Sequence, residues 1–118
     1  MAIRATYRNA RISARKVRPL ADLVRGKFAD EALDILKYQP HRGARMLEKV
    51  IRSAVGNAQD PDQNKGRGYN IEDLVLFDVR VDGGPMFKRI RPRARGMAFM
   101  IKKRTSHISV GIVPIEDL

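Results

Sequence analysis

The chain has 118 residues and a formal net charge of +11, so we expect one ordinary domain with an anionic partner, nucleic acid first and an anionic membrane surface second. It contains no Cys, which excludes disulfides, thiolate metal sites and a Cys nucleophile. No apolar run reaches the length of a signal peptide or a transmembrane helix, so we expect a cytosolic protein.

The first predicted element is a short strand over residues 2–8, where apolar and polar residues alternate. A helix follows from Ala14 to Arg25, with Ser13 as its N-cap and Gly26 as its stop. Pro19 lies inside this helix and is expected to kink or shorten it, because proline removes a backbone donor.

Two further helices and two strands are predicted beyond Gly26. One helix runs from about Ala29 to Tyr38, and the clearest helix, with apolar residues every three or four positions, runs from about His41 to Gln59. A polar loop over Asp60–Gly68 separates it from alternating strands over Leu74–Asp82 and Ile108–Ile112. The long helix is therefore expected to form the centre of the core.

Charge is distributed unevenly along the chain. Residues 1–28 carry 8 basic and 1 acidic side chain, and residues 83–118 carry 8 basic and 2 acidic side chains. Residues 29–82 carry 8 basic and 10 acidic side chains, so the middle is nearly neutral. The two ends are therefore the expected binding surfaces, and the middle is the expected scaffold.

The segment from Gly83 to His107 is too long for an ordinary structureless connection inside a compact domain. Apolar residues on both sides of Pro92–Gly96 predict a two-stranded ribbon that continues the flanking strands, with arms projecting about 35 Å. The ribbon has no acidic residue, and its predicted nucleic-acid contacts are Lys88, Arg89, Arg91, Arg93, Arg95, Lys102, Lys103 and Arg104. A disordered basic loop with only non-specific attraction is the alternative.

A second basic cluster surrounds the first predicted helix. Its predicted phosphate contacts are Arg11, Arg15, Lys16, Arg18, Arg25 and Lys27. A solvated helix face is the alternative.

Enzyme chemistry finds no support in the sequence. Only His41 and His107 are present, and no HExxH, GxSxG or Walker motif occurs, so we predict no catalytic residue, no metal site and no cofactor. His107 is expected at the start of a strand, hydrogen-bonded to backbone or RNA. Acidic residues at the start of the second helix, Asp30 and Glu31, are interpreted as helix-dipole charge.

Several motifs together closely resemble the bacterial large-subunit (50S) ribosomal protein L-twenty-two family. The resemblance runs in order from about Ile3 to Val113. The motifs are Ser13–Arg18, Arg25–Lys27, Gly84–Pro85, Lys88–Arg89, Pro92–Gly96 and Lys103–Ile108.

This resemblance implies an α+β fold with three helices packed on a small three-stranded antiparallel sheet and a long protruding β-hairpin. It implies one ribosomal-protein domain over residues 1–118, with the basic hairpin at residues 84–106. The implied function is that of a structural constituent of the large subunit in the cytoplasmic ribosome, a monomer that binds 23S rRNA and neighbouring proteins and supports assembly. The hairpin is expected to line the nascent-peptide exit tunnel, and its tunnel-facing tip would be Arg91, Pro92, Arg93, Ala94 and Arg95.

Two other function classes are compatible with a basic chain. An architectural protein for duplex DNA would also insert basic ribbons into grooves, but it predicts a dimer seam that the sequence does not suggest. A membrane-active protein would need a basic amphipathic helix, whereas the clearest helix here is nearly neutral.

Overall fold

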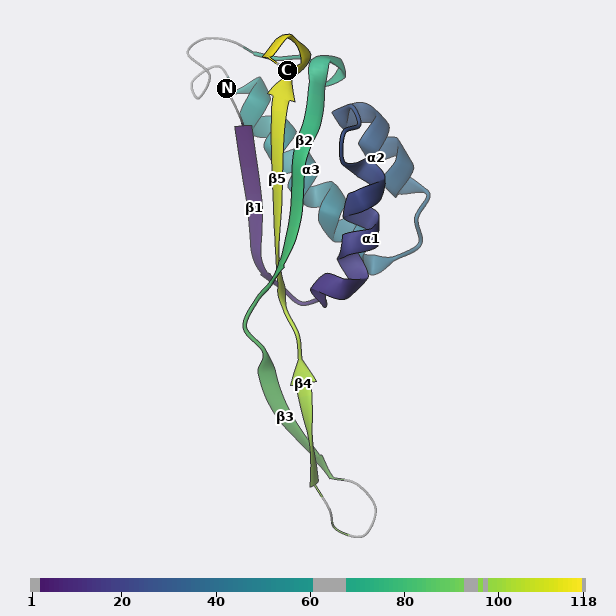
Figure 1. The fold of residues 1–118 in the computed structure, drawn as a ribbon, viewed down its shortest axis with the longest axis vertical. Coiled ribbons are helices and arrows are strands. Elements are labelled where there is room, and N and C mark those ends of the chain that lie inside the picture. Colours follow the sequence, from purple (N-terminus) through teal and green to yellow (C-terminus); the bar gives the residue numbers. More distant parts are fainter. Residues whose placement is uncertain (1–2, 61–67, 93–95, 97, 118) are drawn as a thin grey trace.

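The computed structural model describes residues 3–60, 68–92, 96 and 98–117 (Figure 1). Its elements in chain order are β1 (Ile3–Ala10), α1 (Ala14–Val24), α2 (Ala29–Lys37), α3 (Arg42–Gln59), η1 (Ile71–Asp73), β2 (Leu74–Gly83), β3 (Phe87–Pro92), β4 (Ala98–Lys103), β5 (Ser106–Pro114) and η3 (Ile115–Asp117).

The body is a three-stranded antiparallel sheet covered by three helices. The strand order is β1-β5-β2, so β5 is the central strand and pairs with both neighbours. Helix α3 packs on β1 and β5, α1 lies along β2, and α2 packs against α3 (Figure 1). The predicted α+β class, with three helices and three strands in the body, is confirmed.

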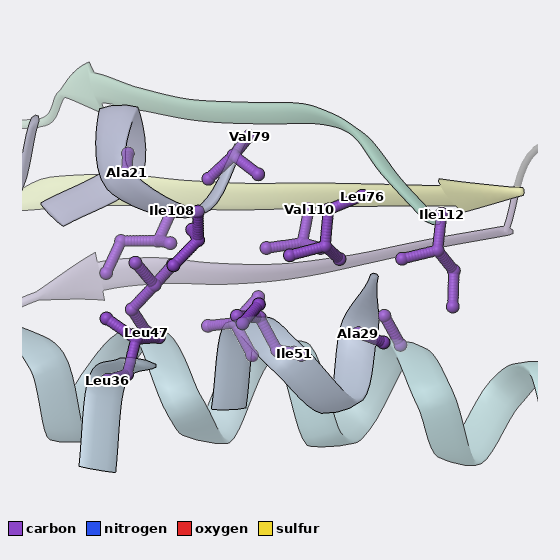
Figure 2. Packing of buried hydrophobic residues seen from close by; sticks show 14 of the residues in the cluster. Ala21, Ala29, Leu36, Leu47, Ile51, Leu76, Val79, Ile108, Val110 and Ile112 are labelled. Atoms are coloured by element: carbon purple, nitrogen blue, oxygen red, sulfur yellow. The ribbon is translucent and has the colours of Figure 1, made fainter. Parts of the chain in front are cut away.

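The core lies between α3 and the sheet. In Figure 2 the inward side chains of β5, Ile108, Val110 and Ile112, extend toward α3, where Leu47 and Ile51 face them. All five side chains are fully buried. Burial of each contributes about 1.5–3 kcal/mol relative to an exposed position, so the apolar spacing of α3 predicted the core correctly.

Helix α1 is continuous across Pro19 and is not shortened, contrary to one of the two effects expected of this residue. Ser13 occupies the N-cap position, but its side chain makes no capping hydrogen bond. The Lys16 amide, which a capping hydroxyl commonly satisfies, donates instead to the Ser13 carbonyl at 3.1 Å. At the other end Gly26 has a φ of +84° and donates its amide to the Leu76 carbonyl at 2.7 Å.

Strand β2 contains a bulge that the alternating sequence did not reveal. The register shifts between Leu76 and Asp78, so Leu76 is buried while Phe77 lies outside the core. A Cβ on Gly111 would lie 3.0 Å from the Phe77 ring, so the glycine lets the ring lie against β5. The alternation predicted over Leu74–Asp82 places Phe77 on the same, inward side as Val79, and this prediction is wrong, because a bulge reverses the side on which the preceding residues point.

Beyond the body, β3 and β4 form a separate antiparallel pair, from Phe87↔Lys103 to Pro92↔Ala98. This ribbon leads away from the helices along the 64 Å axis of a molecule 28 Å by 18 Å across (Figure 1). The body ladder ends at Gly83↔Ser106, so the arms do not continue it without interruption as predicted. Pro85 lies in the interruption and has no amide to donate to a ladder.

A pair of glycine substitutions tests the backbone at the end of α1. Gly26→Ala is expected to lower the free energy of unfolding by about 1–2 kcal/mol, because an L residue pays to adopt the left-handed region. Gly56→Ala, on an exposed position of α3, is expected to raise it by about 1 kcal/mol. A Cβ meets nothing within 4 Å at either site, so urea denaturation reports backbone conformation alone. Equal effects of the two substitutions would contradict this assignment.

Candidate nucleic-acid interface

A basic groove of about 1270 Å³ lies where the start of α1, the start of α3 and the base of the ribbon meet. None of the described residues that line it is Asp or Glu. Its eight basic residues are Arg11, Arg15, Lys16, Arg18, Arg42, Lys102, Lys103 and Arg104. The fold thus unites the two clusters that the sequence placed about 80 positions apart.

Helix N-termini add to the positive potential of this basic groove. Ser13 and Ala14 at the start of α1, and His41 to Gly43 at the start of α3, line it. Among the described residues, no side chain caps either helix, and neither first turn contains an acidic residue. The first-turn amides and the helix dipoles therefore favour an anion in the groove.

Arg42 is not among the residues predicted from the sequence, because it lies in the nearly neutral middle of the chain. Its position in the first turn of α3 could have indicated a binding role, because a cation there faces the positive end of the helix dipole. Such a placement costs about 0.3–1 kcal/mol, and Arg15 and Lys16 incur the same cost on α1. Cations held at unfavourable positions are expected where an anionic partner compensates.

Two of the predicted phosphate contacts also hold the free edge of the sheet. Arg18 Nε donates to the Val81 carbonyl at 3.1 Å, and Arg25 Nη2 donates to the Val79 carbonyl at 2.5 Å. Arg25 also pairs with Asp22 at 2.7 Å. Arg25 and Lys27 are exposed but do not line the basic groove, whereas Arg18 does. A guanidinium has five N–H donors, so Arg18 retains some for a ligand.

The structure describes some, but not all, of the ribbon residues predicted to contact nucleic acid. Lys88 is exposed on β3, and Lys102 and Lys103 are exposed on β4. Arg89 and Arg91 lie in β3. The predicted tip residues Arg93, Ala94 and Arg95 lie outside the described residues.

On the sheet face away from the helices, arginine side chains are paired with an acidic residue. Asp78 accepts a hydrogen bond from Arg4 at 2.7 Å and pairs with Arg80 at 3.1 Å, and Arg4 lies 5.4 Å from the Phe77 ring centre. The Arg4 hydrogen bond, aided by Arg80, lowers the pKa of Asp78, and Asp78 in turn raises the pKa of Arg80. Asp78 therefore stabilises the fold above its ordinary pKa of 3.8 and loses this effect as the pH falls through its lowered value.

His107 lies at the second position of β5, as predicted for a strand start. Its Nδ1 accepts a hydrogen bond from the Asn9 amide at 3.1 Å, so the imidazole binds backbone. In the part of the chain that the structure describes, no three His, Asp or Glu side chains are grouped to hold a metal ion. No helix in that part is long and apolar enough to span a membrane.

A basic groove at the root of a basic ribbon, on a small α+β body, has the charge and shape suited to a polyanion. The family described as Ribosomal protein L22p/L17e matches residues 5–113. The chain therefore belongs to this ribosomal-protein family, as its motifs indicated, and the family is structural rather than enzymatic.

Three similar curated proteins are each named Large ribosomal subunit protein uL22. The protein of Rhodopirellula baltica is 78% identical over 114 residues, covering 97% of this chain and 96% of the relative. That of Caldicellulosiruptor saccharolyticus is 52% identical over 106 residues, covering 90% and 83%. That of Maridesulfovibrio salexigens is 49% identical over 110 residues, covering 93% and 96%.

Two arginine substitutions distinguish an arginine that stabilises the fold from one that does not. Arg25→Ala is expected to lower the free energy of unfolding by about 1 kcal/mol, because the Val79 carbonyl loses a donor. Arg15→Ala is expected to change it by less than about 0.5 kcal/mol, because Arg15 is exposed. Urea denaturation of both variants measures the difference, and equal losses would contradict the division of roles.

Proposed function

We propose that this chain is a structural constituent of the large ribosomal subunit in the cytoplasm, where it binds 23S rRNA and supports subunit assembly. The single observation that carries the RNA-binding proposal is the basic groove, in which, among the residues that the structure describes, eight cations and two helix N-termini converge without a lining acid. Membership of the L22p/L17e family supports the ribosomal context.

Recognition in the basic groove would depend on the RNA backbone rather than on the bases. No Phe or Tyr is among the described residues that line the groove, so an aromatic platform for base stacking is lacking there. Arginine and lysine side chains and helix N-termini bind phosphate oxygens, which position a protein without reading sequence. The groove would therefore select an RNA shape that presents phosphates closely.

The proposed RNA contacts on the body are Arg11, Arg15, Lys16, Arg18 and Arg42, with Arg25 and Lys27 on the adjoining surface. On the hairpin, residues 84–106, they are Lys88, Arg89, Arg91, Arg93, Arg95, Lys102, Lys103 and Arg104. The hairpin would extend between RNA segments to the wall of the nascent-peptide exit tunnel, with residues 91–95 toward the tunnel. Neighbouring large-subunit proteins and the nascent polypeptide would be the other partners of this monomer.

Neutralising the basic groove tests the RNA site. The triple variant Arg11→Gln, Arg15→Gln, Lys16→Gln is expected to bind 23S rRNA more weakly, with a log-log salt slope shallower by about 3, one for each lost phosphate contact. Filter binding of rRNA fragments over a salt series measures both quantities.

The matched control removes the same charge from another surface. Lys37, Lys49 and Arg52 are exposed on α2 and α3 and do not line the basic groove. Their replacement by Gln lowers the net charge by three, from +11 to +8, as in the groove variant. Equal losses of rRNA affinity in both triple variants would mean that the groove contributes only non-specific electrostatic attraction. A preference of the unmodified chain for duplex DNA over rRNA would favour an architectural DNA protein instead.

Site-specific crosslinking tests the tunnel proposal. A photoreactive phenylalanine analogue at position 94 is expected to crosslink a stalled nascent chain in assembled ribosomes, because the tip would line the tunnel. The same residue at position 38, where Tyr38 is 81% exposed on the body, is the control and is expected to give no such product. Crosslinking from position 38 alone would contradict the proposed orientation.

A further inference from the structure

The body and the ribbon meet at a tightly packed joint. The Gly84 amide donates to the Thr105 carbonyl at 3.0 Å, and Thr105 Oγ1 donates to the Pro85 carbonyl at 2.5 Å. Thr105 is 3% exposed and Ser106 is fully buried. Two hydrogen bonds therefore link the two chain segments, and the one donated by the Thr105 hydroxyl is partly buried.

Gly84 permits the close approach of the two segments. A Cβ at this position would lie 2.6 Å from Thr105 Oγ1 and 3.3 Å from the imidazole of His107. Its φ lies outside the left-handed region, so the glycine is required by the lack of space rather than by backbone conformation.

His107 connects the joint to the end of β1. Its ring lies beside Gly84, and its Nδ1 accepts the Asn9 amide at 3.1 Å. Asn9 has a φ of +57° within the irregular register between Tyr7 and Ala10, and the chain then turns toward α1. The hydrogen bond thus ties the ribbon base to the segment that delivers Arg11 to the basic groove.

The joint therefore lies between the two walls of the basic groove. Lys102, Lys103 and Arg104 immediately precede Thr105 on the ribbon wall, and Arg11 follows Asn9 by two residues on the body wall. Like charges on facing walls repel, so the open groove would widen without a connection that resists them.

We propose that Thr105 is a positioning residue which, with Gly84 and His107, holds the two walls of the basic groove at a fixed separation before RNA is bound. This inference rests on the proposed function for its purpose, but the geometry is a property of the free protein. A preformed groove binds more tightly because only the competent fraction of molecules contributes to affinity.

Distance measurements between two spin labels test the joint without RNA. The chain has no native Cys, so Ser53→Cys on α3 and Ile90→Cys on β3 give one label on the body and one on the ribbon. Both positions are exposed. The otherwise unchanged protein is expected to give one narrow distance distribution by double electron–electron resonance, and a broad one would overturn the proposal.

Three joint variants and one control define the cause of any broadening. Thr105→Val removes the hydroxyl while keeping the shape, and Gly84→Ala forces the segments apart; both are expected to broaden the distribution roughly twofold or more. Thr105→Ser keeps the hydroxyl and is expected to restore the narrow distribution. Thr6→Val is the matched control, because Thr6 Oγ1 lies 3.5 Å from Ser109 Oγ on β1 and β5, away from the joint.

If circular dichroism shows that Thr105→Val does not fold, the distance distribution of Gly84→Ala tests the proposal instead, because Gly84 is a residue that Thr105 contacts across the joint. Narrow distributions in every folded joint variant would overturn the proposal. Broadening in Thr6→Val as well would also overturn it, because general loosening of the fold would then explain the effect.

Measuring the affinity for 23S rRNA distinguishes a residue that positions the groove walls from one that contacts RNA directly. Thr105→Val is expected to weaken binding about fivefold with an unchanged salt slope, because the same phosphates are contacted by fewer competent molecules. A shallower slope would overturn the positioning role by making Thr105 a direct contact. If the unmodified chain does not bind rRNA, the proposed function fails, while the label distances still decide whether the joint holds the ribbon.

Discussion

Antiparallel pairing of β5 with β1 on one side and β2 on the other is the constraint on which the other features depend. Ala10 pairs with Ser106, so the residues that follow β1 lie beside those that precede β5. Arg11 is thereby brought near Arg104, although they are far apart in the sequence. The two basic ends of the chain meet in one groove because of this register.

Bringing these charges together is electrostatically unfavourable in the free protein. First-turn cations on α1 and α3 oppose the helix dipoles, and the two groove walls repel each other. The apolar core supplies the opposing stability, since the side chains between α3 and the sheet are almost completely buried. The nearly neutral middle of the chain provides much of that core, including Leu47 and Ile51, so folding and anion binding use largely separate segments.

Much of the fold was predictable because it depends on local periodicity. The apolar spacing of α3 and the alternation in β5 identified the core, and the basic ribbon was identified by its composition. The bulge at Phe77 could not be predicted, because it depends on the space left by Gly111 on a neighbouring strand. Arg42 was missed because it lies in the nearly neutral middle of the chain, and its place in the groove depends on how α3 meets α1.

The edge of β2 shows why counting cations does not give the number of binding residues. An unpaired edge strand exposes backbone groups that can pair with another chain. Gly26 and Lys27 exchange backbone hydrogen bonds with Leu76. Farther along the strand, Arg25 donates to the Val79 carbonyl and Arg18 to the Val81 carbonyl. Arg18 of α1 and its C-cap residue Arg25 therefore cover the sheet edge, while the first turn of α1 presents Arg15 and Lys16 to the groove. Arg18 lies between these positions and both binds the edge and lines the groove, so position along the chain, rather than charge alone, decides what each cation contacts.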